Sequence, residues 1–219
     1  LHLYLKKQAL LISRAPIEVR LKTEVTPELS GALRPDVIIA ALGARPIVPD
    51  IPGIGGKNAF SAEQVYINPD LAGQRAVILG GGLVGAELAV HLAELGREVT
   101  VVELLDRLNY TGARLHGFVL DMKIRELGIR VLTSTEAVAI GGSGAVVRSR
   151  ADDAESLIEA DTVIYAVGVK PEREAAGALR ACASGLSAEF YQIGDCLTPK
   201  NMLEANQAGY HIARDIGRY

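Results

Sequence analysis

Three glycines stand at a spacing that suits the binding of a diphosphate. Gly80, Gly82 and Gly85 form the pattern Gly-x-Gly-x-x-Gly between a short apolar run and an apolar stretch of helical length. In such a unit the first glycine makes the turn, the second lets backbone approach a pyrophosphate, and the third lets helix pack on strand. The N–H groups at the helix start, aided by the helix dipole, face the phosphates. The spacing predicts a phosphate turn made of Gly80, Gly81, Gly82, Leu83, Val84 and Gly85.

An acidic residue stands where this pattern needs one. Glu103 follows a second apolar run, residues 99–102, and lies 23 residues after Gly80. A carboxylate there accepts hydrogen bonds from adenosine ribose hydroxyls and repels a 2′-phosphate, which favours NAD(H) over NADP(H). Arg107, one turn further on, keeps NADP(H) open. The alternative is a glycine-rich turn without ligand, with Glu103 as a solvated residue at a strand end.

Glu87 is the one charged residue in the first turns of this helix. A carboxylate there lies close to where the nicotinamide end of a bound dinucleotide would be, and it can accept from the carboxamide N–H₂. The alternative is that Glu87 only complements the helix dipole. Both interpretations stay open.

Hydrophobic periodicity predicts the elements that position these residues. The glycine turn joins strand 76–79 to helix 83–95, and strand 99–102 follows. Residues 45–57 hold three prolines and three glycines, which indicates extended chain. The other predicted elements are helices 1–11, 27–33 (capped by Thr26) and 114–127, strands 17–21, 36–41, 129–132 and 162–167, and an antiparallel meander over 137–158. The run 36–41 is continuous and apolar, typical of a strand buried on both faces.

Composition narrows the class of protein. The 219 residues carry a net charge of −3, 49% are hydrophobic, and no block of basic residues exceeds Lys6-Lys7. The longest apolar runs are strand-sized, well short of the roughly 20 residues that span a bilayer. Cys182 and Cys196 have no redox or metal-binding spacing. We therefore expect a soluble, cytoplasmic protein that binds neither nucleic acid nor membrane and holds no metal.

No catalytic side chain is assigned. The four histidines are scattered, and none has a carboxylate or nucleophile at a telling spacing. Hydride transfer depends on stacking and orientation more than on a general base. The absence of a triad is therefore compatible with redox chemistry.

Four segments together resemble a known family. They are Val77–Ala89 with its glycine turn, Ala41-Leu-Gly-Ala-Arg-Pro46, Ala166-Val-Gly-Val-Lys-Pro171 and Tyr191-Gln-Ile-Gly-Asp-Cys196. The chain resembles the flavoprotein reductases of the pyridine nucleotide-disulfide oxidoreductase fold over essentially its whole length. Lys200-Asn-Met-Leu-Glu-Ala205 and Val101-Val-Glu103 are similar to the carboxy-terminal part of the NADH:flavin oxidoreductases, in the 2,4-dienoyl-CoA reductase and 2-enoate reductase branch.

The resemblance implies an α/β fold in which one domain is inserted into another. A Rossmann-type NAD(P)H-binding domain, residues 71–170, would interrupt an incomplete FAD-type domain made of residues 1–70 and 171–219. The parallel sheet and the small antiparallel meander belong to the inserted domain. Gly168, at the end of its last strand, is assigned to the NAD site.

The resemblance also implies a flavin site. Asp195, after Gly194, would accept from a ribityl hydroxyl of FAD, and a helix beginning near Asn201 would point its positive end at the flavin. Gly43 would bring backbone close to FAD, although Leu42 stands where the family has threonine. Because the sequence has only one Gly-x-Gly-x-x-Gly turn, we expect FAD in the intact protein and weak or no retention on this chain, which alone should be inactive.

The chain opens at Leu1 within an apolar pattern, so we expect a piece of a longer polypeptide. In the family an upstream barrel carries FMN and an iron-sulfur cluster and reduces the enoate. The predicted function is an electron-input module that binds NADH and passes hydride to FAD. The alternatives are a module that holds ADP or another nucleotide without hydride transfer, and an interaction domain that has lost its ligand.

Overall fold

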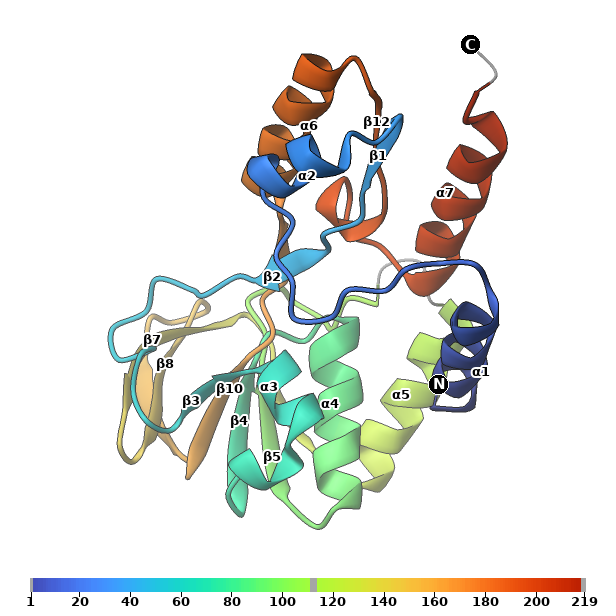
Figure 1. The fold of residues 1–219 in the computed structure, drawn as a ribbon. Coiled ribbons are helices and arrows are strands. Elements are labelled where there is room, and N and C mark those ends of the chain that lie inside the picture. Colours follow the sequence, from blue (N-terminus) through green and yellow to red (C-terminus); the bar gives the residue numbers. More distant parts are fainter. Residues whose placement is uncertain (1, 111–113, 218–219) are drawn as a thin grey trace.

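A five-stranded parallel sheet forms the centre of the computed structural model, which describes residues 2–110 and 114–217 (Figure 1). All neighbouring strands in it run parallel. In spatial order they are β3 (Ala59–Ser61), β10 (Thr162–Tyr165), β4 (Arg75–Leu79), β5 (Glu98–Val102) and β6 (Arg130–Leu132). The predicted α/β class, with a parallel sheet and an antiparallel meander, is confirmed.

Helices cover one face of this sheet and the meander covers the other (Figure 1). The helices are α3 (Ala62–Ile67), α4 (Leu83–Glu94) and α5 (Arg114–Glu126), and the meander is β7 (Thr135–Gly141), β8 (Gly144–Ser149) and β9 (Glu155–Glu159). Ile78 packs toward the helices, whereas Val77 and Leu79 pack toward the meander. Because successive side chains of a strand point to opposite faces, a strand covered on both faces reads as a continuous apolar run.

A second, smaller unit is built from two segments that lie before and after the central sheet in the sequence. Strand β1 (Val37–Ala40) pairs in parallel with β12 (Glu189–Gln192). Its helices are α2 (Pro27–Leu33), with Thr26 as its cap, and α6 (Arg173–Leu186). Ile38 and Ala40 pack on α6, but Ile39 is 43% exposed. The prediction that this strand is buried on both faces is therefore wrong, because helices cover only one side of a two-stranded sheet.

The chain crosses between the two units twice. Strands β2 (Ala44–Pro46) and β11 (Val169–Pro171) pair antiparallel at these crossings. The central sheet includes β3, which lies before the predicted boundary at residue 70, so the chain enters this sheet by residue 59. The division into a nicotinamide domain and an FAD-type domain stays a prediction.

The remaining elements lie at the ends of the chain and in short turns. They are helices α1 (His2–Arg14) and α7 (Met202–Asp215) and the 3₁₀ turns η1 (Pro69–Leu71) and η2 (Gly194–Cys196). The strand predicted at residues 17–21 is wrong: Ile17, Val19 and Leu21 are exposed and no strand pairs with them among the described residues. An alternating pattern forms a strand only where a neighbouring strand offers free backbone groups. Over 2–110 and 114–217, no helix combines the length and apolar character needed to cross a membrane.

Candidate functional site

The glycine turn has the geometry that its spacing predicts. Gly80 has a φ of +107°, and its N–H donates to the Val102 carbonyl at 2.8 Å, which ties the turn to β5. A Cβ on Gly85 would overlap the carbonyl oxygen of Gly80. Helix α4 begins after Gly82, which has no side chain to cap it. The N–H groups of the first turn of α4 have no acceptor within the helix, which suits the binding of an anion.

Glu103 is buried and bonded to the glycine turn. One carboxylate oxygen accepts from the Gly81 N–H at 2.6 Å, and the other accepts from the Leu105 N–H at 2.8 Å. The residue is 8% exposed, yet it lines a cavity. Each carboxylate oxygen has a second lone pair, so both can still accept from a ligand hydroxyl.

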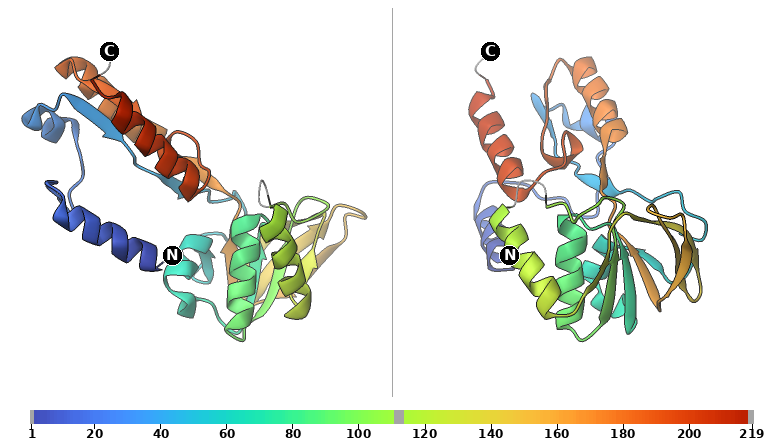
Figure 2. Two further views of the ribbon diagram at one scale, coloured as in Figure 1. Left: turned by 90° about the vertical axis from the view of Figure 1, so that its right-hand side faces the viewer. Right: turned by 180° about the vertical axis from the view of Figure 1, so that it is seen from behind.

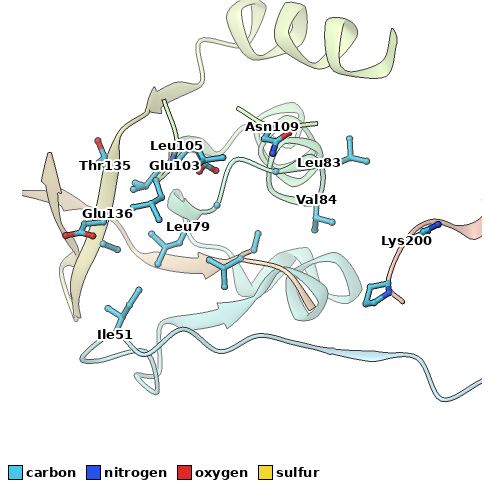
Figure 3. Close-up of a pocket in the computed structure, with 18 of the residues that line it drawn as sticks. Ile51, Leu79, Leu83, Val84, Glu103, Leu105, Asn109, Thr135, Glu136 and Lys200 are labelled. Atoms are coloured by element: carbon cyan, nitrogen blue, oxygen red, sulfur yellow. Dashed lines mark hydrogen bonds between the residues drawn. The ribbon is translucent and has the colours of Figure 1, made fainter. Parts of the chain in front are cut away.

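This cavity has a volume of about 1070 Å³ and lies between the larger unit and the start of α7 (Figure 3). One wall carries the glycine turn, the start of α4 and Glu103, and the opposite wall is the segment 199–204 at the start of α7. Ligand pockets of about 300–1,000 Å³ hold drug-sized molecules, so this cavity suits a large one such as a dinucleotide. Figure 3 shows Glu103 and Lys200 at opposite ends of it, with Leu83 and Val84 between them.

The structure brings half of the predicted NAD-site residues to this cavity. Its lining includes Gly80, Gly82, Leu83, Val84 and Glu103.

The others lie behind or beside the cavity. Gly81 holds Glu103 through its N–H, and Gly85 packs against Gly80. Arg107 is exposed and is not part of the lining. Gly168 lies between β10 and β11, where its carbonyl accepts from the Ile47 N–H at 3.0 Å. Their roles in binding stay predictions.

Glu87 lies outside the cavity lining and has a partner. Its Oε1 is 2.6 Å from Nε2 of His116, on α5. Burial, and secondly the charge of Glu87, raise the pKa of Tyr66. That hydroxyl therefore keeps its proton and donates to the Val84 carbonyl at 3.4 Å. A role for Glu87 toward nicotinamide stays a prediction.

A smaller cavity of about 400 Å³ brings the three predicted flavin residues together. Gly43, Gly194 and Asp195 line it with the start of α7. Asp195 accepts from the Lys200 N–H at 3.2 Å, and Asn201 caps α7 by accepting from the Glu204 N–H at 3.0 Å. The backbone at the two glycines, the Asp195 carboxylate and the start of α7 are groups that suit the ring and ribityl end of a flavin. The sequence offers no second glycine turn for the adenosine half.

Sequence reasoning missed several residues of the larger cavity. Asn109, Thr135, Glu136 and Pro199 line it, but no motif marks them. Asn109 reaches it because its N–H donates to the Gly81 carbonyl at 3.2 Å. The segment that begins at Lys200 gave a signal through the family resemblance, though without a role for its side chains.

Neither cysteine forms a disulfide in the part of the chain that is described. No group of three or more His, Cys, Asp or Glu side chains there is placed to hold a metal ion. Cys196 is buried, and its thiol lies 3.2 Å from the Ala40 carbonyl. Cys182 is free and half-buried.

Comparison with known proteins agrees with this geometry. The NADH oxidase of Thermoanaerobacter brockii is 29% identical over 212 residues, which make up 94% of this chain and 32% of that protein. The bilirubin reductase of Mediterraneibacter gnavus is 32% identical over 82% of this chain and 27% of its own length. A solved complex of 2-naphthoyl-CoA reductase with 2-naphthoyl-CoA has a TM-score of 0.84 at 28% identity, covering 97% of this chain and 31% of that one.

The chain thus spans about a third or less of the length of these proteins. A family model described as pyridine nucleotide-disulphide oxidoreductase matches residues 1–209. That match takes in the glycine turn, Glu103 and Asp195. The chain belongs to the pyridine nucleotide-disulphide oxidoreductase family, whose Rossmann-type fold is of the kind that binds NAD(P)H and FAD.

Proposed function

We propose that this chain is the NADH-binding, electron-input module of a flavin-dependent oxidoreductase. The observation that carries the proposal is that the uncapped start of α4 and the buried carboxylate of Glu103 line one cavity of about 1070 Å³. The adenosine ribose would bond to Glu103, and the diphosphate would accept from N–H groups at the start of α4. The nicotinamide end would then extend toward residues 199–201.

The second cavity supports transfer of hydride to a flavin. Lys200 and Asn201 line both cavities, so the far end of the first meets Gly43, Gly194 and Asp195. A flavin bound there would supply two-electron acceptor chemistry. The residues of this chain would hold its ribityl chain at Asp195, keep backbone close at Gly43, and orient the nicotinamide against it. FAD would need further contacts for its adenosine half, so we propose that the isolated chain is inactive.

The wider role of the intact protein is also a proposal. The resemblance to the 2,4-dienoyl-CoA reductase and 2-enoate reductase branch, and the similarity to a protein named for 2-naphthoyl-CoA, support reduction of an enoate or enoyl-CoA elsewhere in the polypeptide. FMN and an iron-sulfur cluster would then sit in an upstream barrel. We propose a cytoplasmic location and a preference for NAD(H), since Glu103 would repel a 2′-phosphate.

Titration calorimetry with NADH, NADPH and ADP tests the nucleotide site. We expect the wild-type chain to bind NADH and ADP, and NADPH about tenfold more weakly, as expected for one unfavourable contact with a charge. Gly82→Ala is the matched variant, because the nearest atom to its new Cβ is the Asn109 carbonyl oxygen at 3.8 Å. It should keep the fold and lose most affinity for all three nucleotides, since the methyl group would occupy space where the phosphates approach.

Two outcomes would count against this function. If titration of the folded protein gives no binding heat with any of the three nucleotides, the proposed nucleotide site is wrong. An interaction domain without a ligand is then favoured. If NADH binds, but flavin added in excess keeps its absorbance when NADH is supplied to the full-length protein, the module holds a nucleotide without hydride transfer.

A further inference from the structure

Lys200 occupies a special place between the two cavities. It lines both of them, at the end of the larger cavity opposite Glu103 (Figure 3). Its Nζ lies 3.6 Å from Oε2 of Glu204, one helical turn further on, and about half of each side chain is exposed. Its backbone N–H donates to Asp195, which fixes the main chain at this point.

The charged side chains around the larger cavity single out this pair. Among the described residues of its lining, the acidic ones are Glu103, Glu136 and Glu204, and Lys200 is the one cation. Glu103 is held by two backbone N–H groups, and Glu136 lies 3.3 Å from the guanidinium of Arg148. Within this lining, the charged side chains at the end remote from Glu103 are therefore Lys200 and Glu204, and Asp195, in the adjoining smaller cavity, adds a negative charge that is the same whether Lys200 or Glu204 is replaced.

Nicotinamide changes charge in the reaction. When NADH gives up a hydride, two electrons and one proton leave the neutral dihydronicotinamide ring as H⁻, and the ring of NAD⁺ is left with one positive charge. The acceptor takes the hydride. Any fixed charge near the ring therefore stabilises one oxidation state of the nucleotide over the other.

We propose that the Lys200–Glu204 pair tunes which oxidation state of the nicotinamide nucleotide this site prefers. The inference rests on the proposed function, because that function places the nicotinamide end at residues 199–201. Lys200 repels the NAD⁺ ring and Glu204 attracts it. Paired at 3.6 Å, the two charges largely cancel, so removal of either one shifts the preference, and the two removals act in opposite directions.

The test measures the ratio of the Kd for NAD⁺ to the Kd for NADH by calorimetry on the full chain. Lys200→Met leaves Glu204 alone, so the ratio should fall by about threefold to tenfold, as expected for one screened charge several ångströms away. Glu204→Gln leaves Lys200 alone, so the ratio should rise by a similar factor. Both shifts should shrink as salt is added, because the site is open to solvent.

Two controls confine the effect to the nicotinamide end. ADP has the adenosine and phosphates without the nicotinamide, so its Kd should stay within about twofold in both variants, since well-separated charges are screened. Lys123→Met makes the same change in net charge at a distant pair, because Lys123 bonds to Glu94 between α5 and α4. The ratio of the Kd for NAD⁺ to the Kd for NADH in Lys123→Met should equal that of the wild type. Circular dichroism confirms that each variant is folded.

The possible failures are distinguishable. If wild-type protein binds none of the nucleotides, the proposed function is wrong and this inference with it. If nucleotides bind but the ratio does not move, or moves the same way in both variants, only this inference is overturned. A matching change in the ADP Kd would also overturn it, because Lys200 would then lie beside the phosphates or the adenosine.

Discussion

Gly82 and Gly85 belong to one turn, but a different constraint requires each of them to be glycine. A Cβ on Gly82 would meet no atom closer than the Asn109 carbonyl oxygen, at 3.8 Å, and Gly82 lines the cavity. A Cβ on Gly85 would overlap the Gly80 carbonyl oxygen and lie 3.4 Å from the Cβ of Ala166. Gly82 is thus required by what enters the cavity, whereas Gly85 is required by the packing of α4 against β4 and β10.

Gly85→Ala should therefore destabilise the protein. The backbone of α4 or of the turn must shift to admit the methyl group, which costs about 1–3 kcal/mol for overpacking in a core. Urea unfolding followed by circular dichroism measures the loss. Gly82→Ala serves as the control and should stay within about 1 kcal/mol of the wild type, as expected for alanine at a helix N-cap that held glycine. Equal losses in the two variants would contradict this division of roles.

The residues that spacing alone could predict, without the family resemblance, are those within one local unit. The glycine spacing and Glu103 belong to a single strand–turn–helix–strand, so their meeting follows from the pattern. Lys200 and Asn109 arrive from other segments, and their place depends on tertiary packing that periodicity does not encode. The same holds for Glu87, whose partner His116 comes from another helix 29 residues away.

Strand β10 enters the central sheet from a distant part of the sequence. This strand comes from residue 162 and lies between β3 and β4. At its start, Asp161 accepts from the backbone N–H of Arg75 at 2.8 Å and from the Arg75 guanidinium at 3.3 Å. These bonds hold the beginnings of β10 and β4 at one level, which fixes their register.

Asp161 should also make stability depend on pH. The hydrogen bond from the Arg75 N–H, followed by its guanidinium, lowers the pKa of the Asp161 carboxyl below its ordinary value of 3.8. A carboxyl with a lowered pKa in the folded state stabilises it above the unfolded pKa, and this contribution is lost as the pH falls through the folded pKa.

We therefore expect Asp161→Asn to lower the urea midpoint of unfolding at pH 7. The difference between the midpoints of the variant and the wild type should shrink as the pH drops below about 4, near the unfolded pKa of an aspartate. The measurement is a series of urea titrations of both proteins between neutral and acid pH. A gap between the two midpoints that stays constant over this range would show that the carboxylate charge contributes nothing.

Elements were predictable where burial and local signals agreed. The buried βαβ unit and the meander follow from their periodicity and their turns, and both are present. Residues 17–21 show the limit of such reasoning, because their alternation is typical of a strand but no partner strand lies beside them. The exposed side of β1 is a second case, since an apolar run does not tell how many layers cover it.

At the scale of the whole molecule, the larger unit is compact and the smaller one projects from it (Figure 2). The central sheet buries residues on both faces, whereas α7 has no buried residue and α1 has none from Leu3 onward. The crossing strands β2 and β11 join the units, and the cavity of about 1070 Å³ lies where α7 faces α4. The site is thus built from one well-packed wall and one weakly packed wall.

Hydrogen–deuterium exchange should report this difference and its response to nucleotide. Amides of β4, β5 and the part of α4 after its first turn should exchange slowly, and those of α1 and α7 fast, because protection follows burial and local contact density. Addition of NADH should slow exchange at residues 83–85 and also at 200–204, since each segment contributes residues to the cavity lining. Strands β1 and β12 should not respond, because neither contributes to that lining.

In Gly82→Ala both effects of NADH should disappear together. Protection gained at residues 83–85 alone would mean that the nucleotide rests on the glycine turn without reaching α7, and the hydride would then have no path to the second cavity.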